Sequence, residues 1–133
     1  MRQMLIVAGV LAIVIVGGGF WYMSRPVGQA SKVEVKIPSL SAAARAGQAR
    51  FSLKCAGCHG AAADGTDQGP PLIHRIYEPG HHGDYAFVMA VRNGVRAHHW
   101  RFGNMPPVAG VDDREIRLIT RFIREVQRAN GIM

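Results

Sequence analysis

The chain contains few acidic residues and only two cysteines. Nine Asp and Glu stand against sixteen Lys and Arg among 133 residues, which gives a net charge of +7. This balance excludes an acidic tail and a neutral surface, and a hydrophobic fraction of 48% excludes disorder by charge. The two cysteines are separated by two residues, a spacing that disfavours a structural disulfide. The length leaves room for one small domain and an appendage, not for a multidomain enzyme.

The longest run without a charge lies near the N-terminus. Sixteen of the twenty residues from Met4 to Met23 are hydrophobic, and a helix of that length spans about 30 Å, the hydrocarbon thickness of a bilayer. Phe20, Trp21 and Tyr22 lie at one end, as interfacial aromatic residues do. The segment 1–25 is therefore predicted to be a single transmembrane anchor. The alternative is a signal peptide cleaved after Gly28-Gln29-Ala30, but residues 17–30 are long for a cleavage region.

Residues 26–39 are interpreted as a tether. They include Pro26, Gly28 and Pro38 and show only a brief apolar alternation. The sixteen residues that follow Met23 reach at most about 50 Å when fully extended, which would let the domain swing near the membrane. The remaining segment, 40–133, is predicted to be the folded domain.

The two cysteines belong to the motif Cys55-Ala56-Gly57-Cys58-His59. This is the spacing of covalent c-type haem attachment, in which each thiol bonds to a vinyl group and the adjacent His ligates the iron. Two alternatives use the same cysteines. A thioredoxin-like site would follow a strand, but the residues before Cys55 have a helical pattern. A zinc site would need two further ligands, such as His98 and His99.

The patterns after residue 40 predict an all-α domain. Ser41 to Lys54 is Ala-rich, and Gly47 and Phe51 lie one helical turn apart on one face. Asp84 begins a short helix that Gly94 ends. Asp112 and Glu115 form a capping box before a last helix that Asn130-Gly131 closes. Its buried stripe is expected to contain Ile116, Ile119, Ile123 and Val126, with Phe122 beside it.

From Leu40 to Met133 the chain resembles the class I c-type cytochromes, small electron carriers with one haem held by His and Met. The resemblance rests on the order of a helix, the haem motif with Gly60, then Gly69-Pro70-Pro71-Leu72, Asn93-Gly94, Met105-Pro106 and a C-terminal helix. It implies one covalent haem c, with His59 as proximal ligand and with Pro70 and Leu72 beside the cofactor. The Pro70 carbonyl would accept the Nδ1 proton of His59. Trp100, Arg96 or Arg101 would lie near a haem propionate.

Met105 is the expected sixth ligand. The other five methionines lie in the anchor region, at the terminus or, for Met89, within a helix where packing is the simpler role. Met105 follows Gly103-Asn104 and precedes Pro106-Pro107, which stiffen the loop and direct the thioether. Two alternatives stay open: Met105 fills the core, or His98 or His99 replaces it on the iron.

With both axial positions filled, the expected chemistry is one-electron transfer through the haem edge, so the protein is predicted to be an electron carrier and not an enzyme. It would act alone or as a subunit of a respiratory or other oxidoreductase complex. In similar proteins haem attachment happens outside the cytoplasm, so the resemblance implies a single-pass inner (cytoplasmic) membrane protein with its haem domain in the periplasm. The basic residues Arg25, Lys32 and Lys36 follow the apolar run, and this charge pattern weakly favours the opposite orientation.

A basic stripe is predicted on the last helix, opposite its apolar face. It consists of Arg114, Arg117, Arg121, Arg124 and Arg128, spaced by three and four residues. A solvated face is one reading, and attraction to an acidic redox partner or to anionic lipid is the other. Nucleic acid is not expected as a partner, because aromatic residues do not alternate with the basic ones.

Five histidines between Leu72 and Met105 depart from the family pattern: His74, His81, His82, His98 and His99. They are interpreted as surface or hydrogen-bonding groups or as a second metal site, for which copper is the expected ion. In the second case the protein would be a haem-containing copper-handling protein. Neighbours in an extended segment point to opposite sides, so one histidine of each pair, together with His74, is expected to form such a site.

Overall fold

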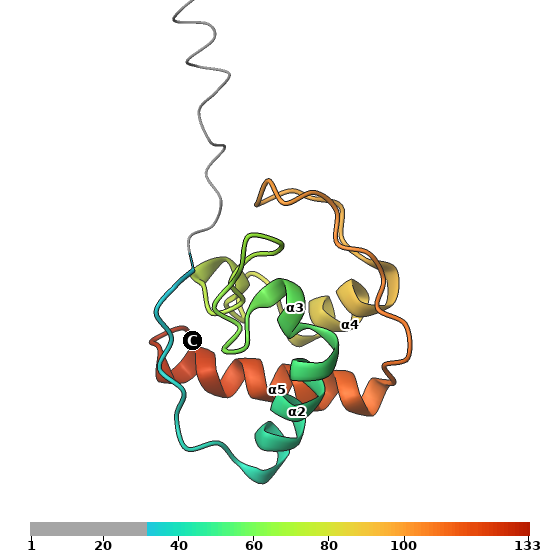
Figure 1. The fold of residues 1–133 in the computed structure, drawn as a ribbon. Coiled ribbons are helices and arrows are strands. Elements are labelled where there is room, and N and C mark those ends of the chain that lie inside the picture. Colours follow the sequence, from blue (N-terminus) through green and yellow to red (C-terminus); the bar gives the residue numbers. More distant parts are fainter. Residues whose placement is uncertain (1–31) are drawn as a thin grey trace, which may run out of the picture.

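The computed structural model describes residues 32–133, which form a helical domain (Figure 1). Its elements are α2 (Ala42–Lys54), α3 (Ala56–His59), the 3-10 helix η1 (Arg75–Tyr77), α4 (Asp84–Asn93) and α5 (Asp113–Ala129). The predicted all-α class is confirmed for these residues, over which the only β pairing is an isolated bridge between Val95 and Met105. None of the helices in 32–133 is long and apolar enough to span a membrane. The proposed anchor, Met4–Met23, lies outside the described residues.

The two longest helices, α2 and α5, pack against each other near the middle of the domain (Figure 1). Gly47 makes the close approach possible, because a Cβ there would lie 1.9 Å from the Leu118 carbonyl oxygen. One turn further on, the rings of Phe51 and Phe122 lie 5.4 Å apart between centroids. The prediction that Gly47 and Phe51 share the packing face of the first helix is confirmed.

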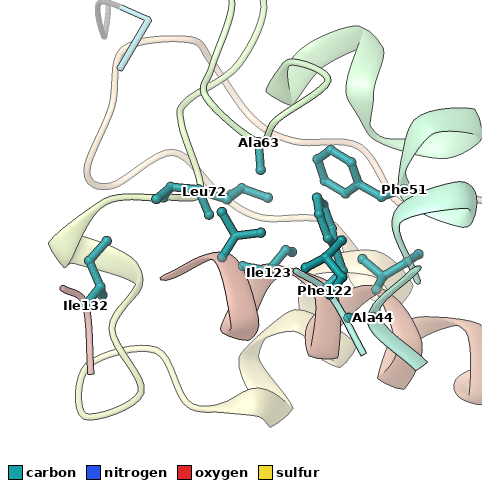
Figure 2. Packing of buried hydrophobic residues seen from close by; sticks show 11 residues of the cluster. Ala44, Phe51, Ala63, Leu72, Phe122, Ile123 and Ile132 are labelled. Carbon is teal, nitrogen blue, oxygen red and sulfur yellow. The ribbon is translucent and has the colours of Figure 1, made fainter. Parts of the chain in front are cut away.

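The core continues from this helix pair to the loop that follows α3. Figure 2 shows Phe51 and Phe122 together, with Leu72 and Ala63 of the loop on one side and Ile123 of α5 next to Phe122 on that same side. Ile116, Ile119, Ile123 and Val126 are buried, as their spacing predicted. Phe122 is fully buried.

The ends of α5 and α4 are also those expected from the sequence. The Asp112 side chain accepts from the Glu115 N–H, and the Glu115 side chain accepts from the Asp112 N–H, so the capping box is present. Gly94 ends α4 with a φ of +73°, a backbone conformation that residues with a side chain rarely adopt. The same residue lies against the Met105 carbonyl, where a Cβ would come within 2.4 Å of the oxygen. Close packing of the two segments therefore requires glycine here.

Residues 32–39 differ from the interpretation of a free tether. The Val33 N–H donates to the Asp64 carbonyl at 2.9 Å, and Lys36 exchanges two hydrogen bonds with the Asn130 side chain. Val35 packs against the core. The brief apolar alternation thus marks a segment that is bound to the domain. The part of the predicted tether before residue 32 lies outside the described residues.

The basic stripe of α5 also needs a correction. Arg124 is 5% exposed and points into the domain instead of into solvent. Arg121 is exposed but is paired with Glu125 at 2.6 Å. The other three members, Arg114, Arg117 and Arg128, are exposed. Arg124 lies at the edge of the stripe, where the loop between η1 and α4 offers backbone carbonyls that the helical spacing alone does not reveal.

Candidate functional site

The haem motif forms one short helical turn. α3 begins after Cys55 and ends at His59, and the His59 N–H donates to the Cys55 carbonyl at 3.0 Å. Residues three and four apart in a helix lie on one face, so Cys55, Cys58 and His59 face the same side. Cys58 is exposed, while Cys55 and His59 are half-buried. No disulfide joins Cys55 and Cys58, so both sulfur atoms are available to bond a haem.

The thiol chemistry of Cys55 argues against a redox dithiol. Burial, together with the neighbouring Cys58, raises the pKa of Cys55 to about 11. A thioredoxin-like nucleophile needs a lowered pKa. In addition, the one group of His, Cys, Asp and Glu within 32–133 that lies close enough to hold a metal ion contains no cysteine. The alternative of a cysteine-bound zinc therefore finds no support in the described part of the chain.

His59 is oriented by a backbone carbonyl. Its Nδ1 lies 2.9 Å from the Pro70 carbonyl oxygen, which can only accept, so Nδ1 carries the proton and Nε2 keeps a free lone pair. This is the contact that the resemblance implied. Burial lowers the pKa of the His59 imidazole, and the bond to Pro70 partly opposes that shift. A neutral ring with a fixed tautomer and one free nitrogen fits an iron ligand.

The loop from Gly60 to Leu72 folds back on α3 and brings Pro70 to His59. The Gly65 N–H donates to the His59 carbonyl at 2.7 Å, and the Leu72 N–H donates to the Ala63 carbonyl at 2.8 Å. Leu72 is buried in the core cluster. Two thiols, an oriented imidazole and an apolar side chain beside them fit a covalently attached haem.

Met105 lies half-buried on a different segment. It exchanges two 2.9 Å backbone hydrogen bonds with Val95, which close a loop over residues 95–105. The loop projects beyond the helices (Figure 1). Trp100, in the middle of this loop, holds it to the rest of the domain. Its Nε1 donates to the Tyr77 hydroxyl at 3.0 Å, and its ring meets the His74 ring edge-on with 5.1 Å between centroids. Met89, expected to pack inside a helix, is instead 37% exposed on α4.

Two polar residues of α5 that the sequence analysis did not single out for this role hold the segment that follows Leu72. Gln127 is fully buried and donates to the carbonyls of Leu72 and Tyr77 at 2.9 and 3.0 Å. Arg124 donates to the Tyr77 and His82 carbonyls and to the Gln127 amide oxygen. The signal that could have revealed them is a polar row, with Thr120, Arg124 and Gln127 at helical spacing beside the apolar stripe.

The histidines that lie close together are not the three that the sequence predicted. His81, His82 and His99 have ligand atoms within 4.8 Å of one another. The prediction that one histidine of each pair would join His74 is therefore wrong: both members of the first pair take part, and His74 lies against Trp100. The alternation rule fails because His81 and His82 lie in the turn after Pro79-Gly80 and not in an extended segment.

A helical domain built around a Cys-x-x-Cys-His turn with an oriented histidine is the architecture of a c-type haem protein. The chain belongs to the cytochrome c family: the family model described as Cytochrome c matches residues 44–127. The protein is thus an electron carrier with covalently bound haem c, in a family whose members generally transfer electrons and are not enzymes. No curated protein and no solved structure matches the chain significantly.

Proposed function

We propose that this protein is a monohaem electron carrier with His59 and Met105 as axial ligands. The observation that carries this proposal is the 2.9 Å contact between His59 Nδ1 and the Pro70 carbonyl, because it leaves Nε2 available on the face that the two thiols share. The Met105 thioether would raise the reduction potential of the iron relative to a second imidazole. Cys55 and Cys58 hold the group covalently.

When bound, the haem supplies a one-electron Fe(III)/Fe(II) couple. The chain's own residues supply its surroundings: His59 is held by Pro70, and Met105 is held by the backbone bridge to Val95. Trp100 is held by its hydrogen bond to the Tyr77 hydroxyl, and its indole would be already oriented beside a haem propionate. His59 and Met105, each held by backbone contacts, would keep the surroundings of the haem rigid and would leave no iron position for a substrate.

The proposal includes a location and a partner class. Met4–Met23 would anchor the protein in the inner membrane with the haem domain in the periplasm, as the apolar run and the need for haem attachment outside the cytoplasm suggest. The redox partner would present an acidic surface, which fits the excess of Lys and Arg and the exposed Arg114, Arg117 and Arg128. The protein would work alone or within an oxidoreductase complex.

Haem staining after denaturing electrophoresis tests the attachment. The stain should stay with the full-length chain in the wild type and be lost when Cys55 and Cys58 are both changed to Ser. Met89→Ala, on the exposed face of α4, serves as the control that keeps the stain. Stain that survives loss of both thiols would contradict covalent attachment at this motif.

N-terminal sequencing of the membrane fraction tests the anchor. The proposal expects the chain to begin before Met4 and to leave the membrane only with detergent. A soluble product that begins at Ser31 would instead identify the apolar run as a cleaved signal peptide.

A further inference from the structure

Four imidazoles form a cluster where the turn before α4 meets the loop 95–105. Nε2 of His81 lies 3.3 Å from Nε2 of His99. The His82 ring is 4.6 Å from the His81 ring and 5.2 Å from the His99 ring between centroids. The His98 ring borders the group, 4.2 Å from that of His99. We define the histidine cluster as His81, His82, His98 and His99.

The spacing of the nitrogen atoms suits a bound metal ion. A tetrahedral ion with nitrogen ligands at 2.0–2.1 Å places neighbouring nitrogens about 3.3 Å apart. The distance between His81 and His99 has this value, and all three ligand atoms of His81, His82 and His99 lie within 4.8 Å of one another. Small rotations of the rings would bring the third nitrogen to the same ion.

Two of the rings are oriented as metal-binding histidines are. Nδ1 of His82 lies 2.6 Å from the Ile76 carbonyl, and Nδ1 of His98 lies 2.8 Å from the Arg96 carbonyl. Because a carbonyl only accepts, each Nδ1 carries the proton and each Nε2 has a free lone pair. Hydrogen bonds of this kind fix the tautomer and aim the ring in known metal sites.

Both segments that carry the cluster are held by contacts outside it. The buried guanidinium of Arg124 donates to the His82 carbonyl, and the His81 and His82 N–H groups donate to the Glu78 carbonyl. The loop on the other side is closed by the bridge between Val95 and Met105 and is tied to η1 by Trp100 and Tyr77. The imidazoles are thus brought together before any ion binds, which lowers the ordering cost of binding.

From this geometry we propose that His81, His82 and His99, with His98 at the edge, bind one divalent late transition-metal ion, and bind Cu²⁺ more tightly than Zn²⁺. Imidazole nitrogens suit these ions, whereas Ca²⁺ and Mg²⁺ require oxygen ligands, and the general order of affinities places Cu²⁺ above Zn²⁺. Exposed His81 and His99 leave the site open to ions from solvent. The site uses none of the residues that hold the haem.

Metal titration of the haem-loaded full chain, made without a polyhistidine tag, tests the proposal. Calorimetry with Cu²⁺ and separately with Zn²⁺ should give one ion per chain for the wild type. His81→Gln with His99→Gln should weaken binding by about 10-fold or more for each imidazole removed, a range that even outer partners of metal ligands reach. His74→Gln is the matched control, because His74 lies against Trp100 and outside the cluster.

Spectroscopy separates this site from the haem. The electron paramagnetic resonance spectrum of bound Cu²⁺ should show coupling to imidazole nitrogens. This coupling should disappear in the His81→Gln, His99→Gln variant, while the haem absorption spectrum stays unchanged. Equal metal affinity of the wild type and the double variant would overturn the proposal. So would a loss in His74→Gln as large as that in the double variant, or a change in the haem ligand spectrum on adding Cu²⁺.

Discussion

The guanidinium of Arg124 donates a 2.6 Å hydrogen bond to the backbone carbonyl of Tyr77, 47 residues earlier in the chain. It also reaches the His82 carbonyl and the Gln127 amide oxygen, and its planar group lies 4.9 Å from the centre of the Phe87 ring. These contacts, together with the bond from Gln127 to the same Tyr77 carbonyl, replace water around backbone carbonyls of the segment before α4. Arg124, whose spacing in the sequence predicts a surface position, is thus buried and connects several segments of the domain.

Replacing Arg124 by Leu should lower the free energy of unfolding by about 3 kcal/mol, since each buried acceptor left without a donor costs about 1–3 kcal/mol. Arg128→Leu, an exposed change on the same helix, should cost less than about 0.5 kcal/mol. Denaturant unfolding of the two haem-loaded variants measures the difference. Equal losses would show that Arg124 contributes no more than a solvated side chain.

Gly47→Ala should be destabilising by about 2 kcal/mol, although alanine is the better helix former. The added Cβ would lie 1.9 Å from the Leu118 carbonyl oxygen, so α2 and α5 would have to move apart. Gly80→Ala is the control, because a Cβ at that position meets nothing within 4 Å. Thermal unfolding of both variants checks this, and a Gly47→Ala protein as stable as the control would contradict the close packing.

Glu125 should make the domain sensitive to acid. The N–H and hydroxyl of Ser41 donate to its carboxylate at 3.0 and 2.8 Å, and Arg121 adds an ion pair. These contacts, led by the Ser41 N–H, lower the pKa of Glu125 from 4.5 to about 2. A lowered pKa in the folded state gives stability that is present above about pH 4.5 and is lost as the pH falls toward 2.

Glu125→Gln should therefore be less stable than the wild type at neutral pH and should lose less stability between about pH 5 and pH 2. Denaturant midpoints measured across this range check the slope. Glu34→Gln, at an exposed position, is the matched control. If the wild type and Glu125→Gln lose stability in parallel, the carboxylate contacts do not set the acid response.

Met105→Ala should open the distal side of the iron. The ferrous wild type is expected to resist carbon monoxide, and the variant should bind it and show a lower reduction potential, because the soft thioether that favours Fe(II) is gone. Met89→Ala, which removes an exposed methionine from α4, should behave as the wild type. Ready binding of carbon monoxide by the wild type would mean that Met105 is not a firm ligand.

The helices could be predicted because their signals are local. The capping box of Asp112 and Glu115 and the pairing of Gly47 with Phe51 depend on residues three or four apart, and both are present. Likewise the haem motif carries its own chemistry within five residues. The bond from His59 to Pro70 could be anticipated only through the resemblance, since Pro70 lies eleven positions after His59, at the far side of a loop.

What the sequence did not reveal depends on contacts between distant segments. Arg124 fits the spacing of a surface stripe, and only the position of Tyr77 and His82 shows that its charge is turned inward. The pairing of His81 with His99 depends on a turn and on a loop that meet in space. Periodicity describes one element at a time, so it cannot predict which element covers a given side chain.

Because residues 32–39 are attached to the domain, the segment left to link the domain to the predicted anchor is shorter than the sequence suggested. Between Met23 and Lys32 only eight residues remain, which span at most about 29 Å, whereas the whole stretch from Ser24 to Ser39 would have reached about 50 Å. The chain enters the domain where Val33 meets Asp64, close to the loop that orients His59. If Met4–Met23 anchors the chain as proposed, the domain could tilt but would stay within about 29 Å of the bilayer, so a redox partner would have to reach it near the membrane surface.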